Sequence, residues 1–338
     1  MTQNALAHAW VGIDVSKEKL DACLLRDNDK TTSLLVDNSA KGFSKLLAWV
    51  KRNAPEAQLH FALEATGAYS NAVAEYLVEA QEKVSVVNPA LIRHAGIAYG
   101  FHNRTDKTAA VVIALFCKKE KPALWRMARP EVRLLVALVR RREMLRDQRI
   151  QEHNRLSNPG LPKEIIQSLN KHIRYLDKEI AHLEERITMH IQNTPALQAD
   201  KELLLSIPGI GETTAHFLLA ELPEVSEFEE ASAVAAYAGL APCERSSGSS
   251  IKGKTHLSKR GKAELRHGLY MPAVAAIQCN PLVKALYDRL RERGHTRMSA
   301  LGAAMRKLLM LAYGVLKNGQ DFDPKWQEKS KQPAPAAT

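Results

Sequence analysis

Acidic residues at the ends of apolar runs constrain this chain most. Asp14 follows the strand-like run Val11-Gly12-Ile13, and Glu64 follows Phe61-Ala62-Leu63. Asp106 opens a later helical pattern. A single acid of this kind is best explained as solvated at the end of its element. Three together indicate a cation, because carboxylates withdrawn from water need compensating charge, and their oxygens suit a divalent ion such as Mg²⁺ or Mn²⁺.

Strand and helix patterns alternate from residue 8 to about residue 125. Three consecutive strands precede strands that are separated by helices, which is the order of an RNase H-like α/β fold. We therefore expect an α/β domain over residues 1–128, although fold order alone is weak evidence for function. The expected strands are 9–15, 20–26, 32–37, 59–64 and 83–87, and the expected helices are 41–53, 70–81 and 106–118.

Long helices are expected over residues 129–195, at 131–156 and 163–192, on either side of the breaker Asn158-Pro159-Gly160. The second helix carries an apolar seam with alternating spacings of three and four, which is typical of a coiled coil and predicts a dimer or tetramer. An internal helical hairpin with residues 131–156 is the alternative. The seam consists of Ile166, Leu169, Ile173, Leu176, Ile180, Leu183 and Ile187.

Residues 196–325 are expected to be mostly helical, with helices at 263–278 and 298–316. Two amphipathic segments flank Pro208-Gly209-Ile210-Gly211, which matches a helix-hairpin-helix. Gly209 and Gly211 would let the backbone approach a nucleic-acid phosphate, and the N–H groups that open the second helix would bind that anion. An ordinary tight turn between two helices explains the same residues.

Positive charge favours a polyanionic partner. The chain has 48 Lys and Arg against 37 Asp and Glu, a net charge of +11 and a pI near 9.4. Residues 246–262 form a loop rich in Gly and Ser without a single acid, which is either a nucleic-acid contact or a solvated flexible loop. The candidate contacts in this loop are Lys252, Lys254, Lys259, Arg260 and Lys262, and Arg104 and Lys107 flank Asp106.

Other features argue against a membrane or zinc protein. No uninterrupted apolar run reaches the roughly 18 residues of a spanning helix, and the N-terminus lacks the pattern of a signal peptide, so we expect a cytoplasmic protein. The four cysteines contain no CxxC pair and read as reduced, packed thiols. Residues 326–338 are polar and then rich in Pro and Ala, which predicts a disordered tail.

Several short motifs are specific only in combination. They are Gly12-Ile13-Asp14-Val15-Ser16-Lys17, Leu63-Glu64-Ala65-Thr66-Gly67, Val87-Asn88-Pro89, Arg104-Thr105-Asp106, Ile207-Pro208-Gly209-Ile210-Gly211, Tyr237-Ala238-Gly239-Leu240, Ser247-Gly248-Ser249-Ser250 and Leu269-Tyr270-Met271-Pro272. With them the chain resembles, from about residue 9 to about residue 322, the DEDD transposases of bacterial insertion sequences. The specific likeness is to the one-hundred-ten family, whose relatives include the Piv invertases and the bridge-RNA-guided recombinases.

The resemblance implies a RuvC-like N-terminal domain with four metal-binding acids, of which Asp14, Glu64 and Asp106 match the first three. The fourth position, in the family pattern D-x-x-D, is Ala109 here. An engineered Asp→Ala change and natural divergence are both open, and either would weaken a divalent-ion site. The resemblance also implies that Ser247 is the attacking nucleophile in a C-terminal transposase domain. A serine hydroxyl needs a base or a metal to activate it.

The family implies an RNA-guided DNA recombinase whose structured guide RNA pairs with donor and target DNA, leaving the protein to bind backbones and shape. Attack by Ser247 would give a covalent phosphoserine that keeps the bond energy for rejoining. One alternative is a RuvC-like structure-specific nuclease that uses water, with Ser247 incidental. Another, suggested by Ala109, is a nucleic-acid-binding protein that does not cut.

Overall fold

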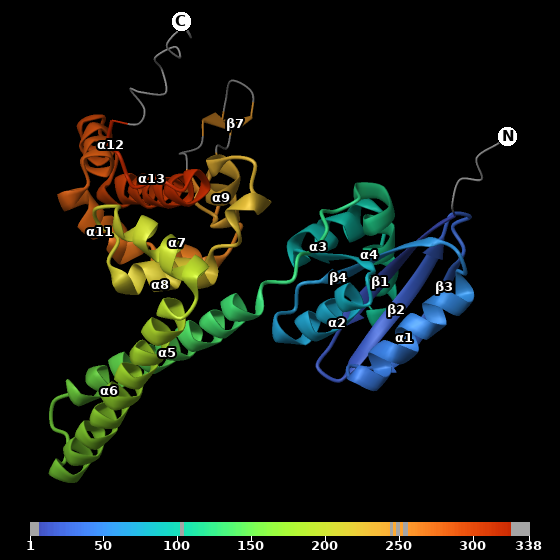
Figure 1. The fold of residues 1–338 in the computed structure, drawn as a ribbon, viewed down its shortest axis with the longest axis horizontal. Helices are drawn as coiled ribbons and strands as arrows, with labels where there is room; N and C mark the ends of the chain where they lie inside the picture. Colours follow the sequence, from blue (N-terminus) through green and yellow to red (C-terminus); the bar gives the residue numbers. More distant parts are fainter. Residues whose placement is uncertain (1–6, 102–104, 244–245, 248–250, 253–255, 326–338) are drawn as a thin grey trace, which may run out of the picture. The chain divides into compact units, whose positions relative to one another are not determined.

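A computed structural model describes residues 7–101, 105–243, 246–247, 251–252 and 256–325 (Figure 1). The chain divides into two compact units, Met1–Ala128 and Arg129–Thr338. The long helices and the later helices therefore belong to one unit, because a single apolar core includes Leu135, Ile187, Leu204 and Leu308. The tail expected at residues 326–338 lies outside the described residues.

A five-stranded mixed sheet forms the centre of the first unit, in the order β3-β2-β1-β4-β5. Its strands are β1 (His8–Val15), β2 (Lys19–Arg26), β3 (Thr31–Asp37), β4 (Gln58–Glu64) and β5 (Lys83–Val87). The first three strands pair antiparallel, whereas β1, β4 and β5 pair parallel. This order is compatible with the RNase H-like fold expected from the sequence.

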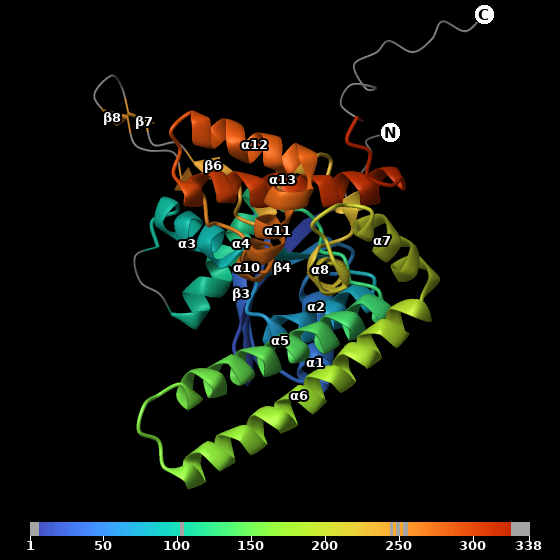
Figure 2. The ribbon, with the colours of Figure 1, turned by 90° about the vertical axis from the view of Figure 1, so that its left-hand side faces the viewer.

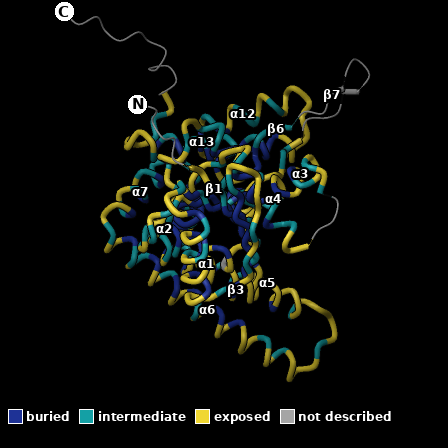
Figure 3. The backbone as a smooth tube through the Cα atoms, turned by 90° about the vertical axis from the view of Figure 1, so that its right-hand side faces the viewer, coloured by how far each residue is buried: buried dark blue, intermediate teal, exposed yellow. Residues whose placement is uncertain are grey.

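Helices cover both faces of this sheet because side chains alternate along each strand. Val11 and Ile13 of β1 pack with α1 (Ala40–Asn53) and α2 (Ala68–Glu79) on one face. The opposite face packs against α4 (Asp106–Glu120), with α3 (Pro89–Ala98) beside it. Strands β1, β2 and β4 are mostly buried, whereas the edge strand β3 is mostly exposed (Figure 3).

The five expected strands agree with the structure to within one residue at each end. Helix α3 was not expected, although Asn88 and Pro89 begin it. The Asn88 side chain accepts a hydrogen bond from the N–H of Ala90, and proline is well tolerated at the first helical position.

The second unit is mostly helical. Its helices are α5 (Pro130–Leu156), α6 (Lys163–Gln192), α7 (Pro195–Leu205), α8 (Glu212–Glu221), α9 (Ala231–Tyr237), α10 (Ala263–Gly268), α11 (Tyr270–Cys279), α12 (Pro281–Glu292) and α13 (Arg297–Asn318), with a short 3₁₀ turn at Val225–Glu227. The single helix expected over 263–278 is two helices, because Pro272 has no N–H to donate to Gly268 and thus falls in the first turn of α11. Helix α12 was not expected, and it too begins with an Asn-Pro pair.

The heptad seam of α6 faces α5 within the same chain. The two helices form an antiparallel hairpin (Figure 2), and Leu176, Ile180 and Ile187 lie in one core with Leu138 and Leu145 of α5. Along α6, buried positions recur between exposed ones (Figure 3). The structure therefore does not show the coiled coil between chains that the seam predicted, because α5 already covers the stripe that self-association would have buried.

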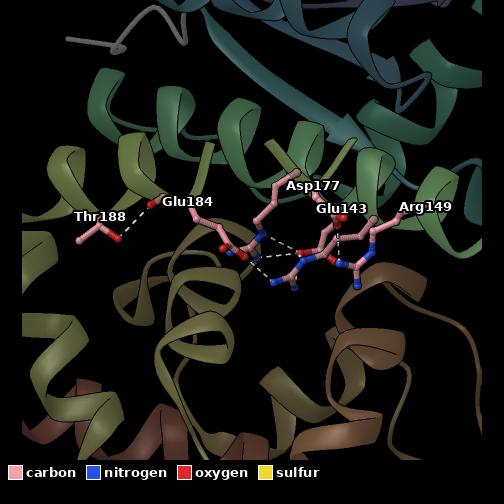
Figure 4. A network of polar contacts seen from close by, with 7 residues as sticks. Glu143, Arg149, Asp177, Glu184 and Thr188 are labelled. Carbon is pink, nitrogen blue, oxygen red and sulfur yellow. Dashed lines mark hydrogen bonds and ion pairs between the residues drawn. The ribbon is translucent and has the colours of Figure 1, made fainter. Parts of the chain in front are cut away.

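Ion pairs follow the same antiparallel arrangement (Figure 4). Arg146 of α5 contacts Glu184 of α6 at 2.6 Å, and Arg149, one turn later, contacts the earlier Asp177 at 3.0 Å. All four side chains are partly exposed, so each pair adds at most about 1 kcal/mol. Apolar burial therefore stabilises the hairpin more than these charges, which favour one alignment of the two helices.

Among the described residues, α13 is the one helix long and apolar enough to cross a membrane. Ala300, Ala304, Leu308 and Ala312 recur every four residues and are fully buried, and the last three belong to the second unit's apolar core. Packing within the unit therefore accounts for the apolar composition of α13.

The buried seam predicts the effect of a charge at Ile180. Because this side chain is only 6% exposed against α5, Ile180→Glu should destabilise the second unit by roughly 3 kcal/mol or more. Met189→Glu is the matched control on α6, since Met189 is 53% exposed. Urea denaturation measures both variants. A lower mass in light scattering with unchanged stability would place the seam between chains instead.

Candidate active site

Asp14 and Glu64 lie side by side at the carboxyl ends of adjacent strands. Strands β1 and β4 are parallel and pair Ile13 with Leu63, so the next residues of the two strands are neighbours on the sheet face that α4 covers. Adjacent strands are about 4.8 Å apart. Two of the acids expected to act together are therefore adjacent.

Helix α4 begins directly at Asp106. Thr105 and Thr108 form a capping box, in which each side chain bonds to the backbone N–H of the other. The helix lies unusually close to β1, since a Cβ atom on Gly12 would be 2.1 Å from the carbonyl oxygen of Ala110. Only glycine permits this approach, which places the first turn of α4 beside the strand-end acids.

A cavity of about 480 Å³ collects the three acids predicted from the sequence. Ala109, on the first turn of α4, also lines it, so a carboxylate at this position would face the same space. Half of the remaining wall comes from α3, and the wall combines apolar residues with Arg93, Thr105 and Thr108. The lining residues are Asp14, Glu64, Ile92, Arg93, Gly96, Ile97, Phe101, Thr105, Asp106, Thr108, Ala109 and Val112.

Burial and negative neighbours disfavour the charged form of Asp14. Desolvation is the largest cause, followed by Glu64, Asp106 and Asp21, and together they raise the pKa of Asp14 from 3.8 to about 6. Because the folded-state pKa is the higher one, Asp14 makes the protein less stable as the pH rises from about 4 through 6. Asp21, which sequence reasoning missed, thus belongs to the same electrostatic group.

These acids fit a divalent cation. None of the groups that shift the pKa of Asp14 is positively charged, so a bound cation would remove the repulsion between the carboxylates. Within the described part of the chain, no three His, Cys, Asp or Glu side chains form a ready-made metal cluster. The acids surround the cavity without converging on a single point.

Ser247 lies in the second unit, on strand β7 (Ser246–Ser247), which pairs antiparallel with β8 (Ile251–Lys252). A second antiparallel pair is formed by the flanking strands β6 (Pro242–Cys243) and β9 (His256–Leu257). The predicted nucleophile and Lys252 are therefore on the two arms of one β-hairpin (Figure 2). Lys254, like Arg104 in the first unit, lies outside the described residues.

Two glycines allow the segments before β6 and after β9 to pack closely together. The N–H groups of Lys259 and Lys262 donate to the carbonyls of Gly239 and Tyr237 at 3.1 and 2.7 Å. The segments approach so closely that a Cβ on Gly261 would lie 2.4 Å from the nitrogen of Gly239. Gly239 also has a φ of +68°, which favours glycine. The Tyr-Ala-Gly-Leu motif thus anchors the strands that lead to Ser247.

The remaining basic candidates differ in what they contact. Lys259 and Arg260 are exposed, as is Lys107 on the first turn of α4. Lys262 instead contacts the buried carboxylate of Glu221 at 2.6 Å, beside Arg140 at 2.7 Å. Lys262 is thus paired with a carboxylate inside the unit, and a nucleic-acid contact by its ammonium group stays a prediction.

The two glycines of the expected helix-hairpin-helix also differ. Gly209 has a φ of +100° and packs so closely on α11 that a Cβ would lie 2.7 Å from the Cα of Ala276. Its conformation therefore serves packing between helices. Gly211 precedes the first turn of α8 and faces open space, so phosphate contact at this turn stays a prediction.

Comparisons with known proteins agree along the chain. Residues 11–159 match the profile of a DEDD transposase domain, and residues 201–288 match the profile described as Transposase IS116/IS110/IS902 family. The chain is 33% identical to the pilin gene-inverting proteins of Moraxella lacunata and Moraxella bovis, over 96% of this chain and 100% of each relative. An insertion element IS110 protein of Streptomyces coelicolor is 33% identical over 41% of this chain and 35% of its own length.

The chain belongs to the IS110 family of transposases. Family membership implies a DNA substrate, and the DEDD domain implies dependence on a divalent metal. Asp14, Glu64 and Asp106 all fall within the matched DEDD segment, and Ser247 falls within the second matched segment.

The approach of α4 to β1 predicts that this transposase will not tolerate Gly12→Ala. The added methyl group would overlap backbone atoms of α4 and should cost roughly 3 kcal/mol or more. Gly96→Ala is the control, because its Cβ would meet Val112 at an ordinary 3.6 Å and alanine favours the helix by about 1 kcal/mol. Urea denaturation distinguishes them, and equal stability of the two variants would contradict the close packing.

Because the basic residues make different contacts, replacing them should weaken DNA binding in one case and protein stability in the other. Replacing both Lys259 and Arg260 with Gln should lower the salt dependence of DNA binding, as a log–log slope, by about 2 with little change in stability. Lys262→Gln should destabilise the protein by roughly 2 kcal/mol, since Glu221 is only 2% exposed. Binding isotherms at several salt concentrations and melting curves measure both effects. Weaker binding by Lys262→Gln without loss of stability would make Lys262 a DNA contact.

Proposed function

We propose that this chain is a DNA recombinase that cuts and rejoins strands through a covalent phosphoserine at Ser247, assisted by a divalent cation at Asp14, Glu64 and Asp106. The observation that carries the proposal is the acid-lined cavity of the DEDD unit, in a chain whose second unit has the serine of the family motif on strand β7. The full-length likeness to pilin gene-inverting proteins supports recombination of DNA.

In the proposed step, the Ser247 hydroxyl oxygen attacks the phosphorus of a phosphodiester. A bond forms between this oxygen and phosphorus, the bond from phosphorus to one sugar oxygen breaks, and the proton leaves the serine while the departing sugar oxygen takes one up. Attack by a hydroxyl of another strand reverses the step and releases Ser247. No external energy source is needed, because one phosphoester replaces another.

The acids hold the cation, which when bound would stabilise negative charge on the attacked phosphate and favour ionisation of the serine hydroxyl. Asp14 is the central member, since it neighbours Glu64 on the sheet and Asp106 acts on its charge. The acids lie in one unit and Ser247 in the other. The proposal therefore requires residues of both units to act on one phosphate.

We also propose that a structured guide RNA selects donor and target DNA. The support is the net charge of +11 together with the resemblance to bridge-RNA-guided relatives. Sequencing the RNA that copurifies with the full chain tests this part separately. Recovery of one defined transcript is expected, and only heterogeneous cellular RNA would contradict it.

The serine mechanism predicts a protein–DNA adduct that resists denaturation. Ser247→Ala should abolish the adduct while DNA binding persists, whereas Ser246→Ala on the same strand is the matched control. Both variants are compared with the parent chain and with Ala109→Asp, which would add a carboxylate to the cavity. Denaturing gels with end-labelled DNA and Mg²⁺ or Mn²⁺ detect the adduct, and gel shifts measure binding.

Each outcome separates the competing functions. An adduct with Ser246→Ala but not with Ser247→Ala supports the proposal, and one that persists in Ser247→Ala excludes this nucleophile. Cleavage without any adduct would indicate a RuvC-like nuclease that uses water. Cleavage by the Ala109→Asp variant alone would make the parent chain a DNA-binding form that does not cut.

A further inference from the structure

Asp21 lies directly across the sheet from Asp14. Strands β1 and β2 are antiparallel and pair these two residues, so both side chains project from the same face. That face is the one covered by α4, because Cys23, two residues further along β2, packs against Ala110 and Ala114 of α4. Strand pairing thus gives a row of three acids across β2, β1 and β4, in the order Asp21, Asp14, Glu64.

The first turn of α4 extends over this row. The negative charge of Asp106 raises the pKa of both Asp14 and Asp21, so Asp106 is close enough to act on both strands. Asp21 does not line the cavity that contains Glu64 and Ala109. It approaches Asp14 from the opposite side, where β2 is the neighbouring strand.

The surroundings of Asp21 leave its carboxylate available. Lys19 and Lys107 favour its charged form, but in the part of the chain that the structure describes no Lys or Arg forms a salt bridge with it. Partial burial is the largest influence on this carboxyl and raises its pKa. A solvated acid balanced by the two lysines is the competing explanation.

We propose that Asp21 is a fourth carboxylate of the divalent-cation site, acting with Asp14 and Asp106 from the β2 side. This inference rests on the proposed function. The residue does not occupy the position of the missing acid, since Ala109 faces the cavity on the other side of Asp14. Asp21 would supply the negative charge that Ala109 lacks. The site would then have four acids, with the fourth on β2 rather than at position 109.

Metal binding by the full chain tests the role of Asp21 without any measurement of activity. Calorimetric titration with Mn²⁺ and melting temperatures with chelator or Mn²⁺ are compared for Asp21→Asn, Asp14→Asn and Asp37→Asn. Asp37 is the matched control, because it lies on the neighbouring strand β3 and does not act on Asp14.

We expect Asp21→Asn to raise the Kd for Mn²⁺ about tenfold and to shrink the melting shift caused by the metal, while slightly stabilising the chelated protein. Asp21→Glu should recover part of the affinity, because the charge is kept. Asp14→Asn should abolish the metal response, and Asp37→Asn should leave it unchanged.

The role of Asp21 and the metal site of the proposed function can be disproved separately. If Asp21→Asn binds Mn²⁺ as the parent does while Asp14→Asn does not, Asp21 is a solvated acid and only this inference is overturned. If Asp14→Asn also binds normally, the metal site of the proposed function is wrong as well. Equal weakening by Asp21→Asn and Asp37→Asn would reduce the effect to general surface charge and likewise overturn the role of Asp21.

Discussion

The close packing of α4 on β1 is the constraint on which the candidate site depends. Gly12 has no side chain, so the backbone of α4 at Ala110 and Ala114 lies almost against the strand. Asp106 is only one helical turn before Ala110, and its position beside Asp14 follows from this contact. A larger residue at position 12 would move the helix and with it one of the acids. The glycine before Asp14 is thus as much a part of the site as the carboxylates.

This packing gathers charges that oppose one another. In the metal-free protein, Glu64, Asp106 and Asp21 all disfavour ionisation of Asp14, so the site lowers the stability of its own unit near neutral pH. The apolar clusters on both faces of the sheet offset this cost. A divalent cation bound between these carboxylates would remove the repulsion and recover this cost as binding free energy.

Features that depend on a local pattern can be predicted from the sequence, whereas contacts that depend on the register between strands cannot. Alternation of apolar residues located all five strands, and short motifs located Asp14, Glu64 and Asp106. Helices α3 and α12 were missed even though Asn-Pro pairs mark their starts, a signal that could have found them. Asp21 could not be found in this way, because its relation to Asp14 exists only in the register of β1 and β2.

Two other features were ambiguous in the sequence for the same reason. The heptad seam of α6 specifies that an apolar stripe needs a partner but not whether the partner is α5 or another chain. Lys262 belongs to a basic stretch in the sequence, yet the fold places its ammonium group beside Glu221, some forty residues earlier. In both cases a local pattern was compatible with two partners, and the structure of the single chain shows an internal one.

The division of the chain into two units has a consequence for control of the proposed reaction. The acids and the serine belong to units with separate apolar cores, each of which is complete without the other. Neither unit alone holds both a cation site and a nucleophile, so neither would cut DNA by the proposed step. Cleavage would then require an assembly that brings the Ser247 hairpin and the acid row to the same phosphodiester.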